Sequence, residues 1–355
     1  MRALAIKTSS MGDVIHTLPA LTDAAKAIKG IRFDWVVEEG FAEIPAWHPA
    51  VDRVIPIAIR RWRKNPITTW RNGEWRKFRE TVDQINYDIV IDAQGLLKSA
   101  WLTRYTHGPT HGLDKNSARE PIAARFYDRS HAIAKNQHAV ERVRQLFARS
   151  LGYEIPEQKG HFHLDSDYFL DTRGIRPARQ YMVFLHGTTW ETKHWPEKYW
   201  CDLARYATQS GYAVCLPWGN ENEQLRAERI ARAVDGVHVL SKLNLRDVAS
   251  VIAGASAVVA VDTGLGHLTA ALEVPAVSLY GPTSPDLVGA YGENQVHLTL
   301  DQCPSCQVQN VEPRIFAPMT ADIVWQKLEP IIRTPDTDSE TASDTSATGT
   351  PPKDL

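Results

Sequence analysis

Short apolar runs alternate with longer amphipathic stretches along most of the chain. In the first half, the apolar runs typical of buried strands are residues 3–6, 33–37, 53–57 and 89–92. The helical patterns between them include residues 17–28 and 75–85. In the second half, the strand-like runs are residues 181–185, 213–216, 238–240, 257–261 and 276–280, and the helical patterns include residues 197–209 and 221–233. Because buried strands that alternate with helices form βαβ units, this pattern predicts parallel sheets.

The alternation stops across residues 152–179, where periodicity is weak and Gly and Pro are scattered. This stretch is the best linker candidate, so the simplest architecture is two consecutive doubly wound α/β domains. We place the boundary so that the domains cover residues 1–170 and 171–333. Residues 334–355 are rich in Ser, Thr, Pro and Asp and almost lack large apolar side chains. That composition predicts a disordered acidic tail.

Length and composition agree with a globular protein of two domains. The chain has 355 residues, and no apolar run approaches the roughly 20 residues that span a bilayer. The N-terminal apolar stretch is too short for a signal peptide and four cysteines are too few for a disulfide scaffold, so we expect a cytoplasmic protein.

The two parts of the chain differ in charge. Residues 1–160 hold 25 Lys and Arg against 18 Asp and Glu, a balance of +7. The remaining residues hold 15 against 24, a balance of −9. This asymmetry favours an anionic partner for the first part, and the competing interpretation is a scatter of solvated charges.

The first predicted strand runs directly into Lys7-Thr8-Ser9-Ser10-Met11-Gly12-Asp13, and a helix is expected near Thr17. Ligands of open α/β sheets bind at this end of a strand. Asp13 is therefore a candidate general base toward an acceptor hydroxyl. The alternative, which spacing alone favours, is that Asp13 only caps the helix.

The second domain opens in the same way, with a strand that leads into His186-Gly187-Thr188-Thr189. Small residues with free N–H groups and hydroxyls at this position form an anion cradle. Lys193 follows and adds a cation for a diphosphate. A polar turn with a solvated lysine explains the same spacing equally well.

The most specific segment is Asp262-Thr263-Gly264-Leu265-Gly266-His267, which follows the strand at residues 257–261. Gly264 and Gly266 keep side chains away from a helix N-terminus, whose N–H groups favour phosphate. His267 lies in the first turn and is a candidate donor to a phosphate oxygen, although a lone histidine there is also typical of an ordinary surface position. The segment is neither a Walker loop nor a dinucleotide-binding turn.

Two further segments suggest ligand contacts. Glu223 begins a helix after the strand at residues 213–216 and is a candidate for binding ribose hydroxyls, or else it complements the helix dipole. Residues 60–79 interleave aromatic side chains with cations, among them Arg60, Arg63 and Lys64. Such a segment suits membrane phosphates or anionic sugars. Nucleic acid and a merely solvated basic helix are the alternatives.

Two motifs are discounted. Asp165-Ser166-Asp167 spells a metal-binding DxD but lies in the linker. Cys303-Pro304-Ser305-Cys306 is a single CxxC, and a zinc site needs two further ligands. We therefore expect ordinary loop cysteines and no metal.

Several segments together resemble the lipopolysaccharide heptosyltransferases of glycosyltransferase family 9, and within them the heptosyltransferases I. The segments are KTSSMGDVIHTLPAL, FDWVVEEGFAEIP, VIPIAIRRWRK, IDAQGLLKSA, AREP, KHWPE, LPWG and VDTGLGHLTAAL with the following YGPTSP. They occur in order across about residues 1–300. The resemblance implies a GT-B fold, in which two Rossmann-like domains face each other and the C-terminal one binds the donor.

The resemblance also implies an activity. It is the inverting, metal-independent and cofactor-free transfer of heptose from ADP-L-glycero-β-D-manno-heptose to the first Kdo of Kdo2-lipid A. The enzyme would work peripherally on the cytoplasmic leaflet of the inner membrane, without a nucleic-acid partner. Asp13 and Lys193 match catalytic positions of the family. The donor-binding matches are Thr188, Thr189, Lys193, Glu223, Asp262, Thr263, Gly264 and His267. The acceptor-binding matches are Arg60, Arg63, Lys64 and Arg119.

Three alternative functions stay open, one of them that of a nucleic-acid binder that works through residues 60–79. Another is that of the sister enzyme, heptosyltransferase II, which adds the second heptose. The third is that of a nucleotide-binding module without catalysis. The chain after about residue 295 matches the family less well, which leaves the contacts of the C-terminal part undetermined.

Overall fold

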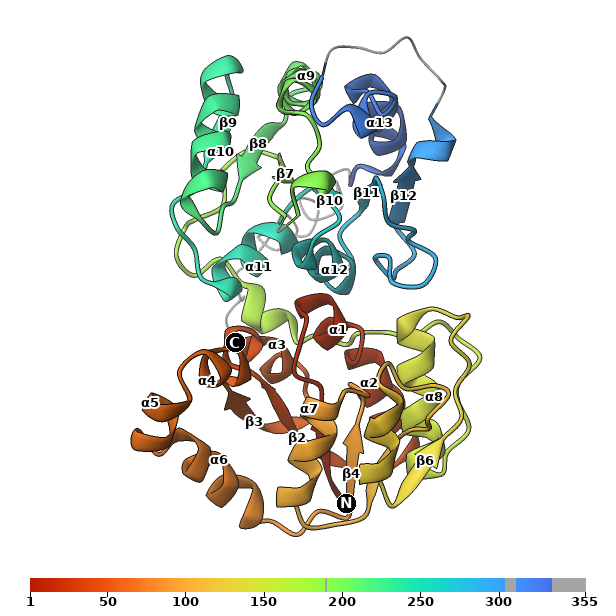
Figure 1. Ribbon diagram of the computed structural model, residues 1–355. Coiled ribbons are helices and arrows are strands. Elements are labelled where there is room, and N and C mark those ends of the chain that lie inside the picture. Colours follow the sequence, from red (N-terminus) through yellow and green to blue (C-terminus); the bar gives the residue numbers. More distant parts are fainter. Residues whose placement is uncertain (189, 304–310, 334–355) are drawn as a thin grey trace, which may run out of the picture.

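The computed structural model describes residues 1–188, 190–303 and 311–333 and shows two α/β domains, one above the other in Figure 1. Thr189, most of the CxxC segment and the expected acidic tail at residues 334–355 lie outside the described residues. No helix in the described part of the chain combines the length and apolar character that crossing a bilayer requires.

The first domain is a six-stranded parallel sheet with helices on both faces. Its strands are β1 (Arg2–Ile6), β2 (Arg32–Glu38), β3 (Val51–Ile57), β4 (Ile89–Asp92), β5 (Thr110–Leu113) and β6 (Arg129–His131). They are ordered β3-β2-β1-β4-β5-β6. The helices are α1 (Met11–Ile15), α2 (Leu18–Ala27), α3 (Glu43–Ala46), α4 (Ile59–Lys64), α5 (Pro66–Arg71), α6 (Glu74–Asp83), α7 (Leu97–Ala100) and α8 (Ala139–Leu151).

The second domain repeats this plan. Its strands are β7 (Tyr181–Leu185), β8 (Ala213–Leu216), β9 (Val237–Val239), β10 (Ala257–Val261), β11 (Ala276–Tyr280) and β12 (Gln295–Thr299). All pair in parallel, in the order β12-β11-β10-β7-β8-β9. The helices are α9 (Glu197–Gln209), α10 (Glu221–Ala233), α11 (Leu245–Ala253), α12 (Gly264–Ala271) and α13 (Ala321–Leu328).

Both faces of each sheet are buried, as the apolar strand sequences predict. In β1, Ala3 and Ala5 pack into one core cluster while Leu4 and Ile6 pack into another on the opposite face. All four side chains are fully buried. Because successive side chains of a strand point to opposite faces, a continuous apolar run fits a strand covered by helices on both sides.

The prediction was wrong or incomplete at several elements. Residues 11–15 form the helix α1, where we expected only a turn before a helix at residues 17–28. Strands β5 (THGL) and β6 (RSH) went unpredicted because they carry few apolar side chains, and β12 (QVHLT) was also missed. Strand β9 begins and ends one residue earlier than expected. Strands β6 and β12 lie at the edges of their sheets and are only partly buried, which imposes a weak apolar pattern, whereas β5 is fully buried in spite of its polar sequence.

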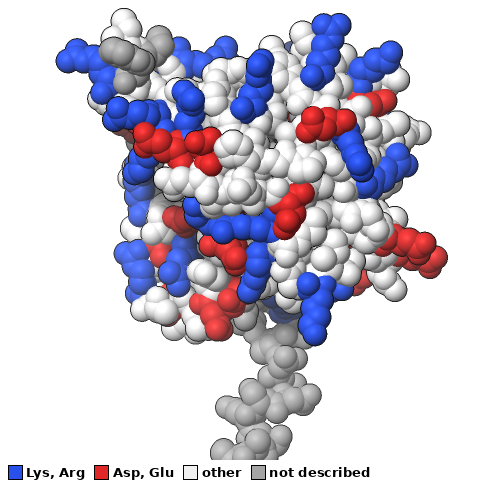
Figure 2. Space-filling model, turned by 90° about the horizontal axis from the view of Figure 1, so that it is seen from below, with Lys and Arg blue, Asp and Glu red and all other residues white. Residues whose placement is uncertain are grey.

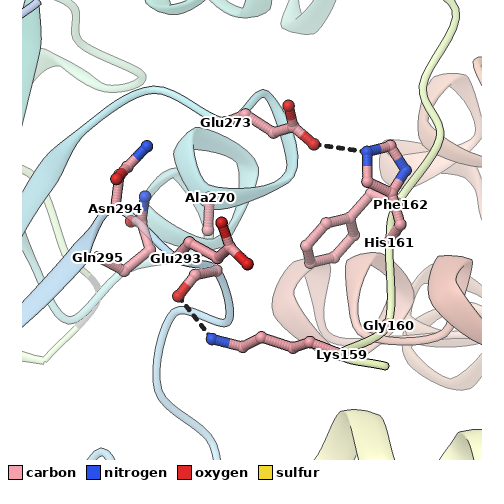
Figure 3. A pocket seen from close by; sticks show the side chains of 10 residues that line it. Lys159, Gly160, His161, Phe162, Ala270, Glu273, Glu293, Asn294 and Gln295 are labelled. Carbon is pink, nitrogen blue, oxygen red and sulfur yellow. Dashed lines mark hydrogen bonds and ion pairs between the residues drawn. The ribbon is translucent and has the colours of Figure 1, made fainter. Parts of the chain in front are cut away.

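The carboxyl ends of the two sheets face each other, and α1 and α12 lie opposite one another across the junction (Figure 1). A second contact lies beside the linker, around a pocket of about 340 Å³ (Figure 3). There Lys159 Nζ donates to the carbonyl of Gly292 at 2.7 Å, and His161 Nε2 lies 2.6 Å from Glu273 Oε1. A further contact lies at the start of α8, where the backbone N–H of Ala139 donates to the carbonyl of Leu287 at 2.8 Å. The two domains therefore touch at several places.

The charges on the outer face of the first domain do not form a single basic patch. Figure 2 views the molecule from the first-domain side and shows Lys and Arg interspersed with Asp and Glu. On this face the excess of positive charge in residues 1–160 is scattered. This face therefore shows no single basic site for an anionic ligand.

Candidate active site between the two domains

Asp13 lies in α1, which follows directly after β1. Its carboxylate accepts hydrogen bonds from the backbone N–H of Ser10 at 2.8 Å and from the Ser10 hydroxyl at 3.0 Å. Lys7 Nζ lies 3.6 Å from Asp13 Oδ1. The side chain still exposes 38% of its surface and lines a pocket. Asp13 thus caps the helix and also faces the cleft, so the two interpretations of this residue do not exclude each other.

The surroundings of Asp13 keep its carboxylate ionised. Burial on its own would raise the pKa. The positive charge of Lys7 and the hydrogen bonds from Ser10 act in the opposite direction and prevail, so the pKa lies below the usual value. Lys7 is held in place because its ammonium also donates to the carbonyl of Ala93 at 2.9 Å. An ionised carboxylate is the form that a general base needs.

The pocket beside Asp13 has a volume of about 400 Å³ and is lined mainly by cations among its charged residues. Its charged lining consists of Lys7, Asp13, Arg119, Lys135 and Arg142. Four positive side chains around one carboxylate suit an anionic ligand whose hydroxyl approaches Asp13. The sequence predicted Asp13 and Arg119 here and missed the other three.

The other predicted acceptor residues lie on α4, beside this pocket and not among its lining residues. Arg60, Arg63 and Lys64 are exposed, and no ion pair of Arg63 or Lys64 occurs among the described residues. Their neighbour Arg61 instead pairs with Glu39 at 3.0 Å and Glu74 at 2.7 Å. The resemblance thus assigns acceptor binding to cations of α4 such as Arg63 and Lys64, which form no ion pair in the described part of the chain. Arg61 instead holds the helix in place through its two ion pairs.

Lys98, in α7, contacts the loop before Asp13. Its ammonium donates to the Ser9 hydroxyl at 3.2 Å. Burial lowers the pKa of Lys98, and the nearby charges of Arg60 and Arg63 lower it further, against the opposing effect of Glu38 and Asp13. The sequence analysis missed this lysine, although the segment IDAQGLLKSA places it one turn after a strand end.

Two of the predicted donor residues, Thr188 and Lys193, meet at Asp262, which directly follows β10. Asp262 Oδ2 pairs with Lys193 Nζ at 2.5 Å and accepts from the Thr283 hydroxyl at 2.8 Å. The Thr188 hydroxyl donates to the backbone carbonyl of Asp262 at 3.1 Å. Three loops that follow β7, β10 and β11 thus meet at one carboxylate. Lys193 is a partly buried member of this network and not a freely solvated lysine.

Thr263 and Gly264 complete the turn, with Thr263 as the N-cap residue of α12. The N-terminus of α12 faces α1 so closely that a Cβ at Gly264 would lie 2.7 Å from Met11 Sδ. A helix N-terminus with a glycine at its first position leaves backbone N–H groups open to an anion. The turn is therefore compatible with the predicted binding of phosphate.

Glu223 lies in the first turn of α10 and folds back over the end of β7. Its carboxylate accepts from the backbone N–H of Gly219 at 2.7 Å. A Cβ at Gly187 would lie only 2.6 Å from Glu223 Cδ, so the absence of a side chain at position 187 makes room for this carboxylate. The position is compatible both with ribose binding and with the helix-dipole interpretation.

His267, in α12, reaches across the junction to the first domain. Its Nδ1 lies 3.1 Å from Nε2 of His16, which follows α1. Burial lowers the pKa of His267 to about 4, against the opposing charges of Asp262 and Asp13. The imidazole is therefore neutral near pH 7, and it is not an ordinary surface histidine. Sequence analysis missed His16 because nothing in its spacing shows which turn of a helix meets another domain.

Two facing Rossmann-like sheets, with a diphosphate-type turn in one and an ionised carboxylate in the other, define a glycosyltransferase of the GT-B type. The chain belongs to glycosyltransferase family 9, the heptosyltransferases, because the model of that family matches residues 75–315. The chain is thus an enzyme that transfers a sugar.

Relatives with a known name agree with this assignment. The chain is 61% identical over 308 residues to lipopolysaccharide heptosyltransferase 1 of Pseudomonas aeruginosa, covering 86% of each chain. It is 57% identical over 297 residues to the enzyme of the same name from Escherichia coli K12, covering 83% of this chain and 92% of the other. A lipopolysaccharide heptosyltransferase 2 from Salmonella typhimurium is 33% identical over 313 residues, covering 81% of this chain and 84% of the other.

Solved structures show the same fold. The E. coli heptosyltransferase WaaC with ADP has a TM-score of 0.84 and 52% identity, and the match covers 92% of this chain and 98% of the other. E. coli ADP-heptose lps heptosyltransferase II has a TM-score of 0.74 at 20% identity, covering 93% and 98%, which shows the shared fold alone. The expected GT-B fold is therefore confirmed.

Proposed function

We propose that this enzyme transfers L-glycero-D-manno-heptose from ADP-heptose to the first Kdo of Kdo2-lipid A, with inversion at the anomeric carbon and without a metal. The observation that carries the proposal is the position of Asp13, an ionised carboxylate in a cationic pocket that lies next to the Asp262–His267 turn. Relatives named heptosyltransferase 1 and a solved relative with ADP-2-deoxy-2-fluoro heptose, 52% identical, support the donor and the lipopolysaccharide acceptor.

We assign donor binding to residues 171–333 and acceptor binding to residues 1–170. In this proposal the donor diphosphate is bound by the loops after β7 and β10. The residues assigned to it are Thr188, Thr189, Lys193, Asp262, Thr263, Gly264 and His267. Glu223 accepts from the ribose hydroxyls. Lys193 is the cation that stabilises charge on the leaving phosphate, and the N–H groups at the start of α12 assist it. His267 contributes a hydrogen bond and no charge, because its imidazole is neutral.

The chemical step is a single displacement. A Kdo hydroxyl oxygen forms a bond to the anomeric carbon of the heptose, and the bond from that carbon to the phosphate oxygen breaks. The electron pair leaves with ADP, while the hydroxyl proton passes to Asp13. Attack from the side opposite the leaving group inverts the anomeric centre. Closure of the domains excludes water that would otherwise hydrolyse the donor.

The cations around Asp13 suit the carboxylates and phosphates of the acceptor. Arg119 lines the pocket itself, and Arg60, Arg63 and Lys64 extend the positive surface along α4. A second pocket of about 510 Å³ lies beside α4 and has a mostly apolar lining. Its lining residues are Ile59, Trp62, Arg63, Thr69, Trp75, Lys98, Trp101 and Leu102. An apolar pocket with two cations supports an acceptor that combines anionic sugars with a lipid.

The same surface supports peripheral binding to the cytoplasmic face of the inner membrane. Cations beside exposed aromatic side chains favour an anionic lipid surface. Co-sedimentation with vesicles that contain anionic phospholipid tests this part of the proposal. We expect binding that weakens as salt rises, and an enzyme that stays in the supernatant at low salt would contradict it.

A choice of acceptors tests the function itself. The purified enzyme is given ADP-heptose with either Kdo2-lipid A or the acceptor that already carries one heptose, and mass spectrometry identifies the product. We expect one heptose to be added to Kdo2-lipid A and none to the second acceptor. Turnover with the second acceptor alone would assign the chain to the sister activity. ADP binding without turnover of either acceptor would contradict catalysis of this reaction.

A further inference from the structure

The two domains pack closely against each other where α1 meets α12. A Cβ at Gly12 would lie 2.5 Å from His267 Cδ2, and a Cβ at Gly264 would lie 2.7 Å from Met11 Sδ. Each helix thus presents a glycine to a side chain of the other. Contacts this close leave little freedom for α1 to slide over α12 while the domains are closed.

His16 adds a directional contact to this packing. It follows α1 directly and lies three residues after Asp13, so the two side chains project from neighbouring positions of one helical turn. His16 Nε2 lies 3.1 Å from His267 Nδ1, and the two rings meet edge to face with their centroids 4.6 Å apart. The helical turn that carries Asp13 is therefore joined to the turn expected to bind the donor diphosphate.

A third histidine, His138, packs against the His16 ring. The ring of His138 lies edge to face against it, with centroids 5.2 Å apart. His138 Nε2 donates to the carbonyl of Gly289 at 3.1 Å, and its Nδ1 accepts from the backbone N–H of Val140 at 3.2 Å. His138 is thereby fixed in one tautomer. His16 is almost fully buried, and burial holds its pKa well below the usual value, so it meets His267 as a neutral partner.

We propose that His16 is a positioning residue, whose hydrogen bond to His267 sets the location of Asp13 relative to the donor diphosphate when the domains close. This inference rests on the proposed function and deepens it. His16 does not touch the reacting atoms. It acts through α1, which bears the base, and through His267, which belongs to the donor site. Misplacement of reacting groups by about 1 Å can lower a rate by about 100-fold.

A second histidine provides a matched control. His161 also links the two domains, because its Nε2 lies 2.6 Å from Glu273 Oε1 beside the linker (Figure 3). Its side chain is 53% exposed, and it lies on the linker and not on α1. Substitution of His161 therefore removes a cross-domain histidine contact, and we expect it to leave the location of Asp13 unchanged.

The test compares His16→Ala, His16→Gln and His161→Ala in the full-length enzyme. We expect His16→Ala to lower kcat by about 10- to 100-fold, while ADP affinity stays close to that of the parent enzyme. The thermal midpoint should fall, because the substitution leaves a cavity at a buried position. A glutamine amide can restore a hydrogen bond to His267, so His16→Gln should recover a large part of kcat. His161→Ala should keep kcat within about twofold of the parent.

The double variant His16→Ala/His267→Ala shows whether the effect of His16 on kcat depends on His267 or is independent of it. If His16 acts through His267, the double variant should have nearly the kcat of His267→Ala alone. Losses in kcat that simply multiply would overturn the proposal, as would a His16→Ala variant whose kcat stays within twofold of the parent.

A measurement without acceptor keeps this inference separate from the proposed function. Small-angle X-ray scattering with and without ADP reports how compact the enzyme is. We expect the ADP complex of His16→Ala to be less compact than that of the parent or of His161→Ala. Equal scattering curves for all three would overturn the role of His16 in closure. Failure of the parent to use Kdo2-lipid A would contradict only the proposed function.

Discussion

Two carboxylates in the cleft have different partners and therefore different roles. Asp262 is held by Lys193 and by the Thr283 hydroxyl, both from its own domain. Asp13 has one lysine at 3.6 Å and leaves part of its surface open to a pocket. In the proposed mechanism, the first carboxylate organises a cation for the donor, and the second remains available to take a proton. This difference is the physical basis on which we distinguish the base from the donor site.

The pH dependence of catalysis tests the role of Lys7. Its charge lowers the pKa of Asp13, so substitution with methionine should raise that pKa. Because the base works only when ionised, the acidic limb of log(kcat/KM) against pH should move to higher pH. Lys26, an exposed lysine in the last turn of α2, is the control. A limb that stays in place in Lys7→Met, or moves equally in Lys26→Met, would contradict this account.

Lys193 is expected to recognise the diphosphate and not the nucleoside. Lys193→Met should weaken ADP binding by about 10- to 100-fold, the range of a lost charge-assisted hydrogen bond, while adenosine affinity stays unchanged. Isothermal titration calorimetry with both ligands measures the ratio. Lys198→Met removes an exposed lysine, paired with Asp202 on α9, and should change neither affinity. An equal loss for ADP and adenosine would show that Lys193 only maintains the fold.

At the level of elements, much of the site was predictable because its residues follow strand ends. The ends of β1, β7 and β10 were placed from apolar runs, and the polar residues after them fall at the facing edges of the sheets. The helix α1 and the cross-domain pair His16–His267 were not predictable. The five residues of α1 are too few to show a helical period. His16 and His267 are 251 residues apart, and no pattern in the sequence indicates that they meet.

Glycine at position 12 should matter for the approach of α1 to α12. In Gly12→Ala, the new methyl group would lie 2.5 Å from the His267 ring, so the two helices must separate. We expect kcat to fall at least about 10-fold, with ADP affinity nearly unchanged because the donor turn stays within its own domain. Gly40→Ala is the control, since a Cβ there meets nothing within 4 Å. Full activity of Gly12→Ala would mean that close helix packing is dispensable for catalysis.

At the level of the whole molecule, the proposed mechanism assigns donor binding and proton removal to different domains, because the chain forms two sheets instead of one. Each sheet brings its strand ends to the junction, so the donor turn and Asp13 sit on separate bodies that can move apart. Such a molecule can bind nucleotide in one domain before the other delivers the base. Catalysis and donor binding should therefore be separable by substitution.

The most direct test of this central claim is a paired measurement on Asp13→Asn. We expect kcat for heptose transfer to Kdo2-lipid A to fall by about 10²- to 10⁴-fold, the usual contribution of a general base, while the dissociation constant for ADP stays within about twofold. Asp52→Asn removes an exposed carboxylate of the same domain, paired with Arg32, and should leave both quantities unchanged. Retained turnover in Asp13→Asn, or a parallel loss of ADP binding, would contradict the account.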